Sequence, residues 1–340
     1  LNSKIVEAQK MEINNIINFE AKANQILLTK VPAEPSYGEA GFNCLVVDAG
    51  CRNPVTGSFI EVPDSKFIIR EDTGRPFKAV GNDYQLVNHS EAFATAERII
   101  EGSGLDTSGM ERDFKISHEG ARAFGFYRFP MHREEVALND TIELQLLVRN
   151  SIDGSMRFCI EYGALRLACL NGMTALGSIG KFKRKHTKYL NIHDAVEPLQ
   201  NVIEVYQSSV ETWKRFKDRA VTDSEAITLI ADAVATPDIK KFIINSIDSE
   251  FSGDVEHCLW HKQLSRAYQV KDVWSEYKKY RKDVGHNLWG VYNALTHWST
   301  HMEAYKETSQ PNIEAIKNDR RTAISKTADN VMVPMLEEVA

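Results

Sequence analysis

The spacing of apolar residues changes midway along the chain, and this change limits the possible folds more than any single motif does. Between residues 42 and 162 the apolar runs are short, and the run from Thr141 to Arg149 begins with the strict alternation typical of a strand with one solvated face. Glu119-Gly120 and Asp153-Gly154 separate such runs and indicate antiparallel hairpins. From Ile192 to Phe216, apolar residues instead recur at the helical period. We therefore predict an α+β fold, in which an antiparallel sheet with flanking helices is followed by a mainly helical C-terminal part.

Turn signals and this change of pattern divide the chain into four expected segments. They are a strand-rich and helical N-terminal extension (1–77), an α+β core with a basic run (78–190), a helical domain (191–308) and a C-terminal tail (309–340). Short strands are expected at 42–47, 66–70 and 77–80, and further helices near 223–246, 256–282 and 286–305. A helix is also expected from Asn88 or Ser90 to Gly102, and the stretch from Ala164 to Met173 is interpreted as a helix or a strand-to-helix transition.

The composition is typical of a protein that stays in a reducing compartment. No run approaches the ~20 apolar residues that a membrane-spanning helix needs, and the first residues lack the apolar stretch of a signal peptide. The five cysteines are widely scattered, which favours reduced and mostly buried thiols over a disulfide framework. We therefore expect a cytoplasmic protein that makes no membrane contact.

The charge of the chain is distributed unevenly. The net charge is −6, which is not typical of a nucleic-acid-binding protein. However, the window from Arg157 to Lys188 holds seven basic residues and one acidic residue, and its densest part runs from Gly180 to Tyr189. A cationic cluster in an anionic chain can bind phosphates while the remainder discourages nonspecific contacts. The alternative interpretation is a solvated basic loop with no ligand.

No motif in the sequence indicates covalent chemistry. Residues 172–178 have the glycine spacing of a phosphate-binding loop, but the lysine that should follow the second glycine is missing. The patterns typical of dinucleotide binding, zinc ribbons and serine hydrolases are absent, and the sequence offers no paired nucleophile and base. We therefore predict no catalytic residue and no cofactor.

Two pairs of histidines could ligate a metal if each pair lies on a helix, because residues four apart share a helix face. The pairs are His257 with His261 and His297 with His301. The neighbouring residues Trp260 and Trp298 favour a different interpretation, in which these stretches are packing helices with hydrogen-bonded histidines. The sequence alone does not decide between the two, and we predict no metal site from it.

The favoured site is a cluster of cations at predicted strand ends and in the basic run. The candidate nucleic-acid-binding residues are Arg149, Arg157 and Arg166, which would line a groove, and Lys181, Lys183, Arg184, Lys185 and Lys188, which would neutralise phosphates. Aromatic residues accompany them. Phe124 and Phe126 alternate on one side of a predicted strand, with Tyr127 and Phe129 on the other, and are expected mostly in the core.

Several segments together resemble a phage- and plasmid-encoded family of uncharacterised proteins, the domain of unknown function DUF932. The similar segments are 80–93, 146–155, 166–173, His186-Thr187 and 289–296, with His301, and the resemblance spans about residues 78 to 305. The family pattern usually has an acidic residue before the last histidine. Here Thr300 stands at that position, which argues against a catalytic role for His301.

The order of helix, hairpin, further strands and helix over residues 88–177 is also similar to the core of single-strand annealing proteins of the Rad52 and Red-beta type. That similarity implies a homo-oligomeric ring or filament in the host cell cytoplasm, which holds one DNA strand by its backbone and promotes annealing or recombination. We therefore expect a phage-associated protein that binds single-stranded DNA without covalent chemistry, possible partners being a host or phage replication protein. The alternatives are a phage accessory or anti-defence protein that binds a host protein, and a metal-dependent enzyme that uses the histidine pairs.

Overall fold

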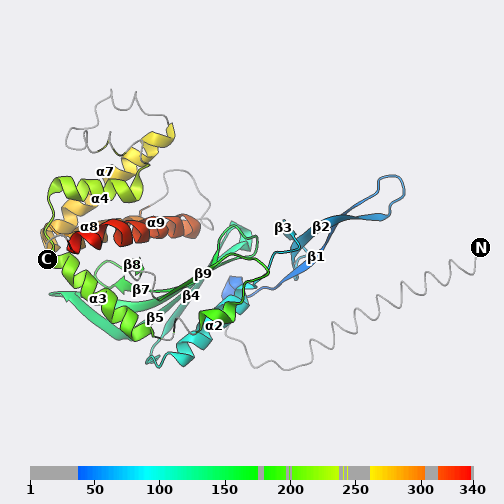
Figure 1. Cartoon of the computed structure of the whole chain (residues 1–340), viewed down its shortest axis with the longest axis horizontal. Coiled ribbons are helices and arrows are strands. Elements are labelled where there is room, and N and C mark those ends of the chain that lie inside the picture. Colours follow the sequence, from blue (N-terminus) through cyan, green and yellow to red (C-terminus); the bar gives the residue numbers. More distant parts are fainter. Residues whose placement is uncertain are drawn as a thin grey trace, which may run out of the picture. The chain divides into compact units, whose positions relative to one another are not determined.

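A computed structural model describes residues 37–174, 180–196, 199, 201–236, 240, 243, 261–302 and 313–337. The part of the expected N-terminal extension before Tyr37 lies outside these ranges. Within them the fold is α+β, as predicted, with two antiparallel sheets and helices that concentrate in the C-terminal half (Figure 1). In the described part of the chain, no helix has both the length and the apolar composition needed to cross a membrane.

The first sheet is small and confirms the three strands expected before residue 81. Its strands are β1 (Cys44–Arg52), β2 (Phe59–Arg70) and β3 (Pro76–Gly81), in the order β1-β2-β3. β3 pairs with β2 only from Ser65 to Ile69. The far half of the β1–β2 hairpin is therefore a two-stranded ribbon, and its side chains are mostly exposed.

The second sheet contains six strands and forms the centre of the fold. They are β4 (Glu111–Ser117), β5 (Arg122–Ala137), β6 (Asp140–Ser151), β7 (Phe158–Arg166), β8 (Asn171–Thr174) and β9 (Lys181–Arg184). The order is β4-β5-β6-β7-β8, and β9 also pairs with β7. β8 pairs with the end of β7 and β9 with its beginning, so these two short strands share one edge of the sheet.

One local expectation is wrong at this edge, and so is part of one alternative interpretation. The stretch from Ala164 to Met173 is neither a helix nor a transition to one, because β7 continues to Arg166 and β8 returns alongside it. The basic run is not simply a loop, because Lys181–Arg184 pairs with β7 as β9. Gly180 allows the chain to enter β9. Its φ is +81°, and a side chain there would meet Val205 at 2.5 Å, so only glycine fits.

One face of the six-stranded sheet is apolar and packs on helices. Tyr127, Leu146 and Tyr162 lie side by side on this face and are buried. The helices that cover it are α2 (His89–Gly102), which was predicted, and α3 (Val202–Asp218). Gly125 lets α2 approach closely, since a Cβ there would stand 2.8 Å from the Phe93 ring.

The C-terminal helices form the rest of the molecule. They are α4 (Asp223–Val234), α7 (His261–Val284), α8 (Leu288–Thr300) and α9 (Ile313–Thr327). Short helical turns lie at Gly38–Ala40, His118–Gly120, Ile192–Ala195, Ala328–Met332 and Pro334–Leu336. The segment expected to be a tail thus holds α9, which packs against β4 and β8 on the side of the sheet opposite α2 and α3 (Figure 1). There Ala315 joins Phe124, Phe126 and Leu147 in a small core.

Candidate nucleic-acid interface

The sheet register places distant cations on one face. Five residues stand opposite one another in successive strands. They are Lys115 of β4, Phe124 of β5, Arg149 of β6, Cys159 of β7 and Lys183 of β9. Because side chains directly opposite each other in neighbouring strands point to the same side, all five lie on the face that α9 partly covers. The face opposite the main core is therefore polar and rich in cations.

Arg149 is buried in this face and engaged in ion pairing. Its side chain is about 4 % exposed and forms an ion pair with Glu161, and it donates to Asn318 Oδ1 of α9 at 2.5 Å. Glu161 also accepts from Lys181 at 2.7 Å. Burial raises the pKa of Glu161, but the charges of Arg149 and Lys181 outweigh it and hold that pKa below the ordinary value. This carboxylate is therefore ionised and shared by two cations.

Arg166 is likewise internal. Its guanidinium donates to both oxygens of Asp140, at 2.5 and 2.8 Å, and Trp289 Nε1 donates to the same carboxylate at 2.7 Å. Arg149 and Arg166 were expected to line a groove. Both are buried and paired within the fold, so they are not part of the exposed interface.

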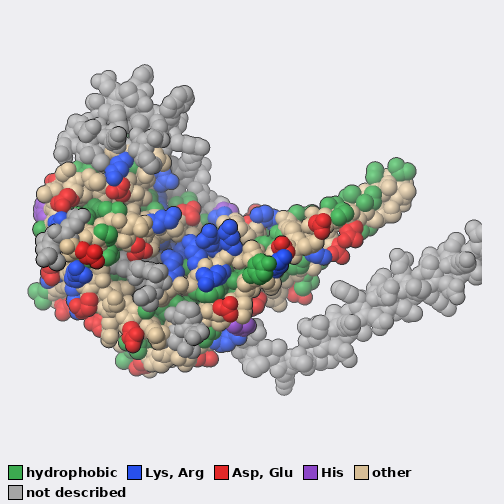
Figure 2. Space-filling view, in the orientation of Figure 1, with side chains coloured by type: hydrophobic (Ala, Val, Ile, Leu, Met, Phe, Trp, Pro, Cys, Tyr) green, Lys and Arg blue, Asp and Glu red, His purple; other side chains and the backbone are tan. Residues whose placement is uncertain are grey.

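The other six predicted residues lie at the edge formed by β9 and the start of β7. Lys181 and Lys188 have carboxylate partners, Glu161 and Asp83 respectively, the second at 3.0 Å. Four cations have no ion-pair partner among the residues that the structure describes, namely Arg157, Lys183, Arg184 and Lys185. Figure 2 shows Lys and Arg side chains gathered over the part of the molecule where Figure 1 places β9. We call these four residues the basic edge.

Lys183 lies in an environment that is already positive. Burial lowers its pKa, and the neighbouring charges of Arg149 and Lys181 lower it further. An anion bound beside Lys183 would offset both effects. The Arg184 guanidinium, by contrast, is exposed and lies 4.8 Å from the centre of the Phe182 ring.

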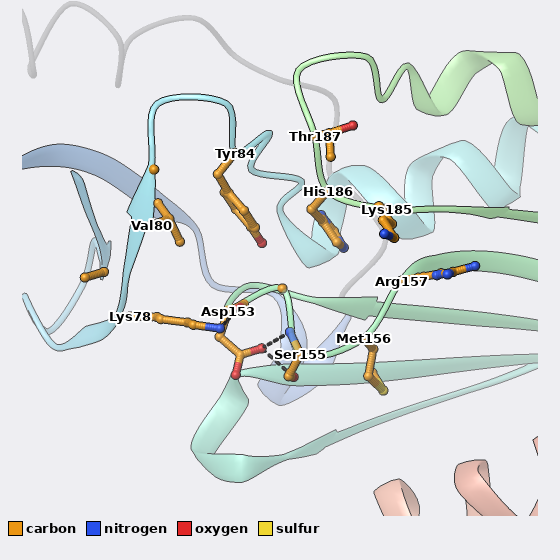
Figure 3. A pocket seen from close by; sticks show the side chains of 13 residues that line it. Lys78, Val80, Tyr84, Asp153, Ser155, Met156, Arg157, Lys185, His186 and Thr187 are labelled. Carbon is orange, nitrogen blue, oxygen red and sulfur yellow. Dashed lines mark hydrogen bonds between the residues drawn. The ribbon is translucent and has the colours of Figure 1, made fainter. Parts of the chain in front are cut away.

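A pocket of about 510 Å³ adjoins the basic edge (Figure 3). Arg157 and Lys185 line it together with Lys78 of β3, and one wall carries the rings of Tyr84 and His186, which stack 5.6 Å apart. Asp153 is the carboxylate among the lining residues, and it accepts hydrogen bonds from the Ser155 backbone and hydroxyl. Cations from three separate segments therefore line this pocket.

Sequence reasoning did not identify Lys78 or Tyr84 as site residues. Lys78 occupies an ordinary strand position, and Tyr84 lies in the loop after β3. Tyr84 is fixed because its hydroxyl donates to the Ile152 carbonyl at 2.6 Å. Their place in the pocket depends on the packing of the first sheet against the β6–β7 turn, which no local pattern encodes.

Most of the aromatic residues near the cations are unavailable to a ligand. Phe124 and Phe126 are buried, as expected, and Phe182 of the basic run is buried as well. Tyr189, which follows the basic run, is 84 % exposed, and Lys188 Nζ lies 5.4 Å from the centre of its ring. Tyr189 is thus a flat surface beside the basic edge on which a base could stack.

Of the two histidine pairs, the structure describes His297 with His301, and this pair belongs to no recognisable metal centre among the described residues. The rings of His297 and His301 lie 4.9 Å apart, and the Tyr280 hydroxyl is 3.2 Å from His297 Nδ1. His257 lies outside the described residues, and His261 begins α7. Among the residues described, no group of three or more His, Cys, Asp or Glu side chains could hold a metal ion. Cys44, Cys51, Cys159 and Cys169 are free thiols, of which Cys51 is exposed.

A family model covers most of the chain. The domain of unknown function DUF932 matches residues 76–322, which contains the span where the resemblance was noted. The chain therefore belongs to the DUF932 family. Neither the curated proteins nor the solved structures yielded a match, so the similarity to Rad52-type and Red-beta-type proteins gains no support from these comparisons.

Proposed function

We propose that this protein binds single-stranded DNA through its phosphates at the basic edge and promotes annealing or recombination without a covalent step. The observation that carries the proposal is the convergence of Arg157, Lys183, Arg184 and Lys185, all without ion-pair partners among the described residues, at one exposed edge of the sheet. Phosphate contacts position a strand without reading its sequence. A protein that binds the backbone in this way leaves the base edges free to pair with a complementary strand.

The pocket beside the basic edge extends the path that a strand could follow. Lys78 and Lys185 both line it, and the Lys78 ammonium donates to the Asp153 carbonyl at 3.0 Å. A flexible single strand can bend into such a recess, whereas a stiff duplex cannot. We therefore propose that the site prefers single strands to duplex DNA.

The annealing activity has a direct test. Two complementary oligonucleotides with a fluorescence donor and acceptor are mixed at low concentration, with and without the protein. We expect the protein to accelerate pairing and to need no nucleotide or metal. Binding to single strands without any acceleration would restrict the function to single-strand binding, and a failure to bind single strands would contradict the proposal.

Self-association is part of the proposal. The β1–β2 hairpin exposes apolar side chains on its far half, including Val55 (90 % exposed) and Phe59 (62 % exposed) (Figure 2). Exposed strands that carry apolar side chains can form an interface with another chain. We propose that they join copies of this chain into a ring or filament, which electron microscopy with and without oligonucleotide would detect.

The same hairpin favours a second candidate function. A phage accessory or anti-defence protein could use these apolar side chains to dock on a host protein. Recovery of one host protein in stoichiometric amount, free of nucleic acid, together with a monomeric purified protein, would favour this alternative over annealing.

Replacing Tyr189 with alanine is expected to weaken binding to single-stranded DNA by about 5- to 150-fold, because stacking of one base on an aromatic ring contributes ~1–3 kcal/mol. The exposed ring contributes little to the core, so the melting temperature should not change. Tyr189→Phe is the matched control, since it keeps the ring and should bind as the native protein does. Fluorescence anisotropy at several salt concentrations measures both variants. A large change in salt dependence would show that Tyr189 acts otherwise than by stacking.

A further inference from the structure

A second cavity, of about 250 Å³, lies between α9 and the polar face of the sheet. It is distinct from the pocket at the basic edge, because the two share no lining residue. The end of α8 contributes Thr300, and β8 contributes Gly172. The cationic residues that line the cavity are Lys115, Arg128, Lys317 and Arg321.

Arg321 is the unusual member of this set. Its side chain is only 8 % exposed, and the guanidinium lies 5.3 Å from the centre of the Phe126 ring. Its Nη1 is buried and has no hydrogen-bond partner among the described residues. Burial lowers the pKa of Arg321, and the charges of Glu314 and Glu161 offset this only in part because the charge of Arg149 acts with burial. A buried cation without a partner is costly to the fold, so its retention at a cavity wall points to a ligand.

The remaining cations are only partly neutralised. Glu314 lies 3.5 Å from Lys115 and 3.4 Å from Lys317, so one carboxylate serves two lysines. Lys115 also lies 3.3 Å from Asp113, and Arg128 lies 3.2 Å from Glu111 outside the lining. When Glu111 is counted with the charged lining residues, four cations meet three carboxylates, which leaves an excess of one positive charge.

Neutral groups complete the polar lining. Thr300 Oγ1 accepts from the Gly172 backbone N–H at 3.2 Å, so its own hydroxyl hydrogen is free to donate into the cavity. A Cβ on Gly172 would stand 3.9 Å from Arg321 Nε, Gln145 Oε1 and Thr300 Oγ1. The glycine thus leaves space at the point where polar atoms of α9, β6 and α8 meet.

We propose that this cavity binds the phosphate of a phosphomonoester, with the Arg321 guanidinium and the Thr300 hydroxyl donating to its oxygens. A phosphomonoester is anionic at neutral pH and offers three acceptor oxygens, which suits a lining that has an excess of positive charge and donors on Arg321 and Thr300. A free mononucleotide and the 5′-phosphorylated end of a DNA strand both present this group. The site is separate from the basic edge and does not depend on the proposed function.

The test is calorimetric titration of the full chain with inorganic phosphate, thymidine 5′-monophosphate, thymidine and acetate. We expect the two phosphates to bind and thymidine and acetate not to bind. Arg321→Met should lower phosphate affinity by about tenfold to hundredfold, the usual effect of losing a hydrogen bond to a charged group. Its melting temperature without phosphate should equal or exceed that of the native protein, because a buried unpartnered charge is removed. Gly172→Ala should also weaken binding, since its methyl group occupies the space beside Arg321.

Lys326→Met is the matched control, because Lys326 lies on α9 but is exposed and away from the lining. It should bind phosphate as the native protein does. Equal binding of thymidine and its monophosphate, no binding of millimolar phosphate, or native affinity in Arg321→Met would each overturn the proposal.

A second comparison separates the two sources of phosphate. If the ligand is a strand end, an oligonucleotide with a 5′-phosphate binds more tightly than one without it, and Arg321→Met removes the difference. If the ligand is a small phosphomonoester, the 5′-phosphate adds nothing although the monophosphate binds. Binding of the unphosphorylated oligonucleotide should not change in Arg321→Met, so this proposal and that of the basic edge can fail separately.

Discussion

A variant in which glutamine replaces all four residues of the basic edge is expected to bind an unphosphorylated single-stranded oligonucleotide much more weakly. The affinity should fall by roughly two to three orders of magnitude at 0.1 M salt. The four residues are Arg157, Lys183, Arg184 and Lys185. Each phosphate that a cation neutralises releases about 0.7 counterion from a single strand, so the loss should shrink as salt rises. Three of these side chains are exposed and the fourth is half-buried, so the variant should fold normally. Fluorescence anisotropy over a salt series measures the change.

The control for this variant must change the net charge equally. Four exposed cations outside the basic edge serve for this control, namely Arg52, Lys217, Lys282 and Lys326. Replacing all four with glutamine removes the same number of positive charges as the basic-edge variant does. We expect this control to bind nearly as the native protein does. If both variants lose affinity equally, the binding depends on overall charge and the basic edge is not a site.

The second large effect concerns stability. Glu161→Ala is expected to lower the free energy of unfolding by about 3–5 kcal/mol, because it leaves the buried Arg149 without its carboxylate partner. Urea denaturation measures this change. Glu211→Ala, which breaks an exposed pair with Lys214, is the comparison and should cost at most about 1 kcal/mol. A similar cost for both variants would show that the buried pair contributes no more than a surface pair.

Removing both charges of this pair tests whether the stability lost in Glu161→Ala comes from the uncompensated charge of Arg149. The double variant Arg149→Met, Glu161→Leu should recover most of the stability lost in Glu161→Ala, because no uncompensated charge stays buried between these two positions. Failure to recover would indicate that the bond from Arg149 to Asn318 of α9 contributes the larger part.

The pH dependence of stability follows from the same carboxylate. The pKa of Glu161 in the folded protein lies below its ordinary value, despite burial, because of Arg149 and Lys181. The stabilisation is therefore fully present above the ordinary carboxyl pKa and is lost as the pH falls through the lowered value. Denaturation at a series of acidic pH values should show less acid sensitivity in Glu161→Ala than in the native protein.

The sequence pattern predicted the faces of the central sheet well. Alternation in β5 placed Phe124 and Phe126 on one side and Tyr127 and Phe129 on the other, and the structure confirms this. Such alternation is local information, since it follows from the two-residue period of a strand. β8 and β9 were missed because each has only four residues, too few for a periodic pattern to appear.

The partners of the cations could not be predicted in the same way. Arg149 meets Glu161, and Arg166 meets Asp140, across neighbouring strands whose register the sequence does not reveal. A charge count treats these buried arginines as equal to Arg157, although only Arg157 is exposed. Arg321 was missed for a related reason, because it lies in a segment expected to be a tail and reaches its cavity only through the packing of α9 on the sheet.

The most direct measurement is the salt dependence of the native protein's affinity for a fluorescent single-stranded oligonucleotide without a terminal phosphate. If the four cations of the basic edge each neutralise one phosphate, the logarithm of the association constant should fall with the logarithm of salt concentration at a slope of about −3. A slope near zero, or no binding at low salt, would contradict the claim that the basic edge binds a DNA backbone.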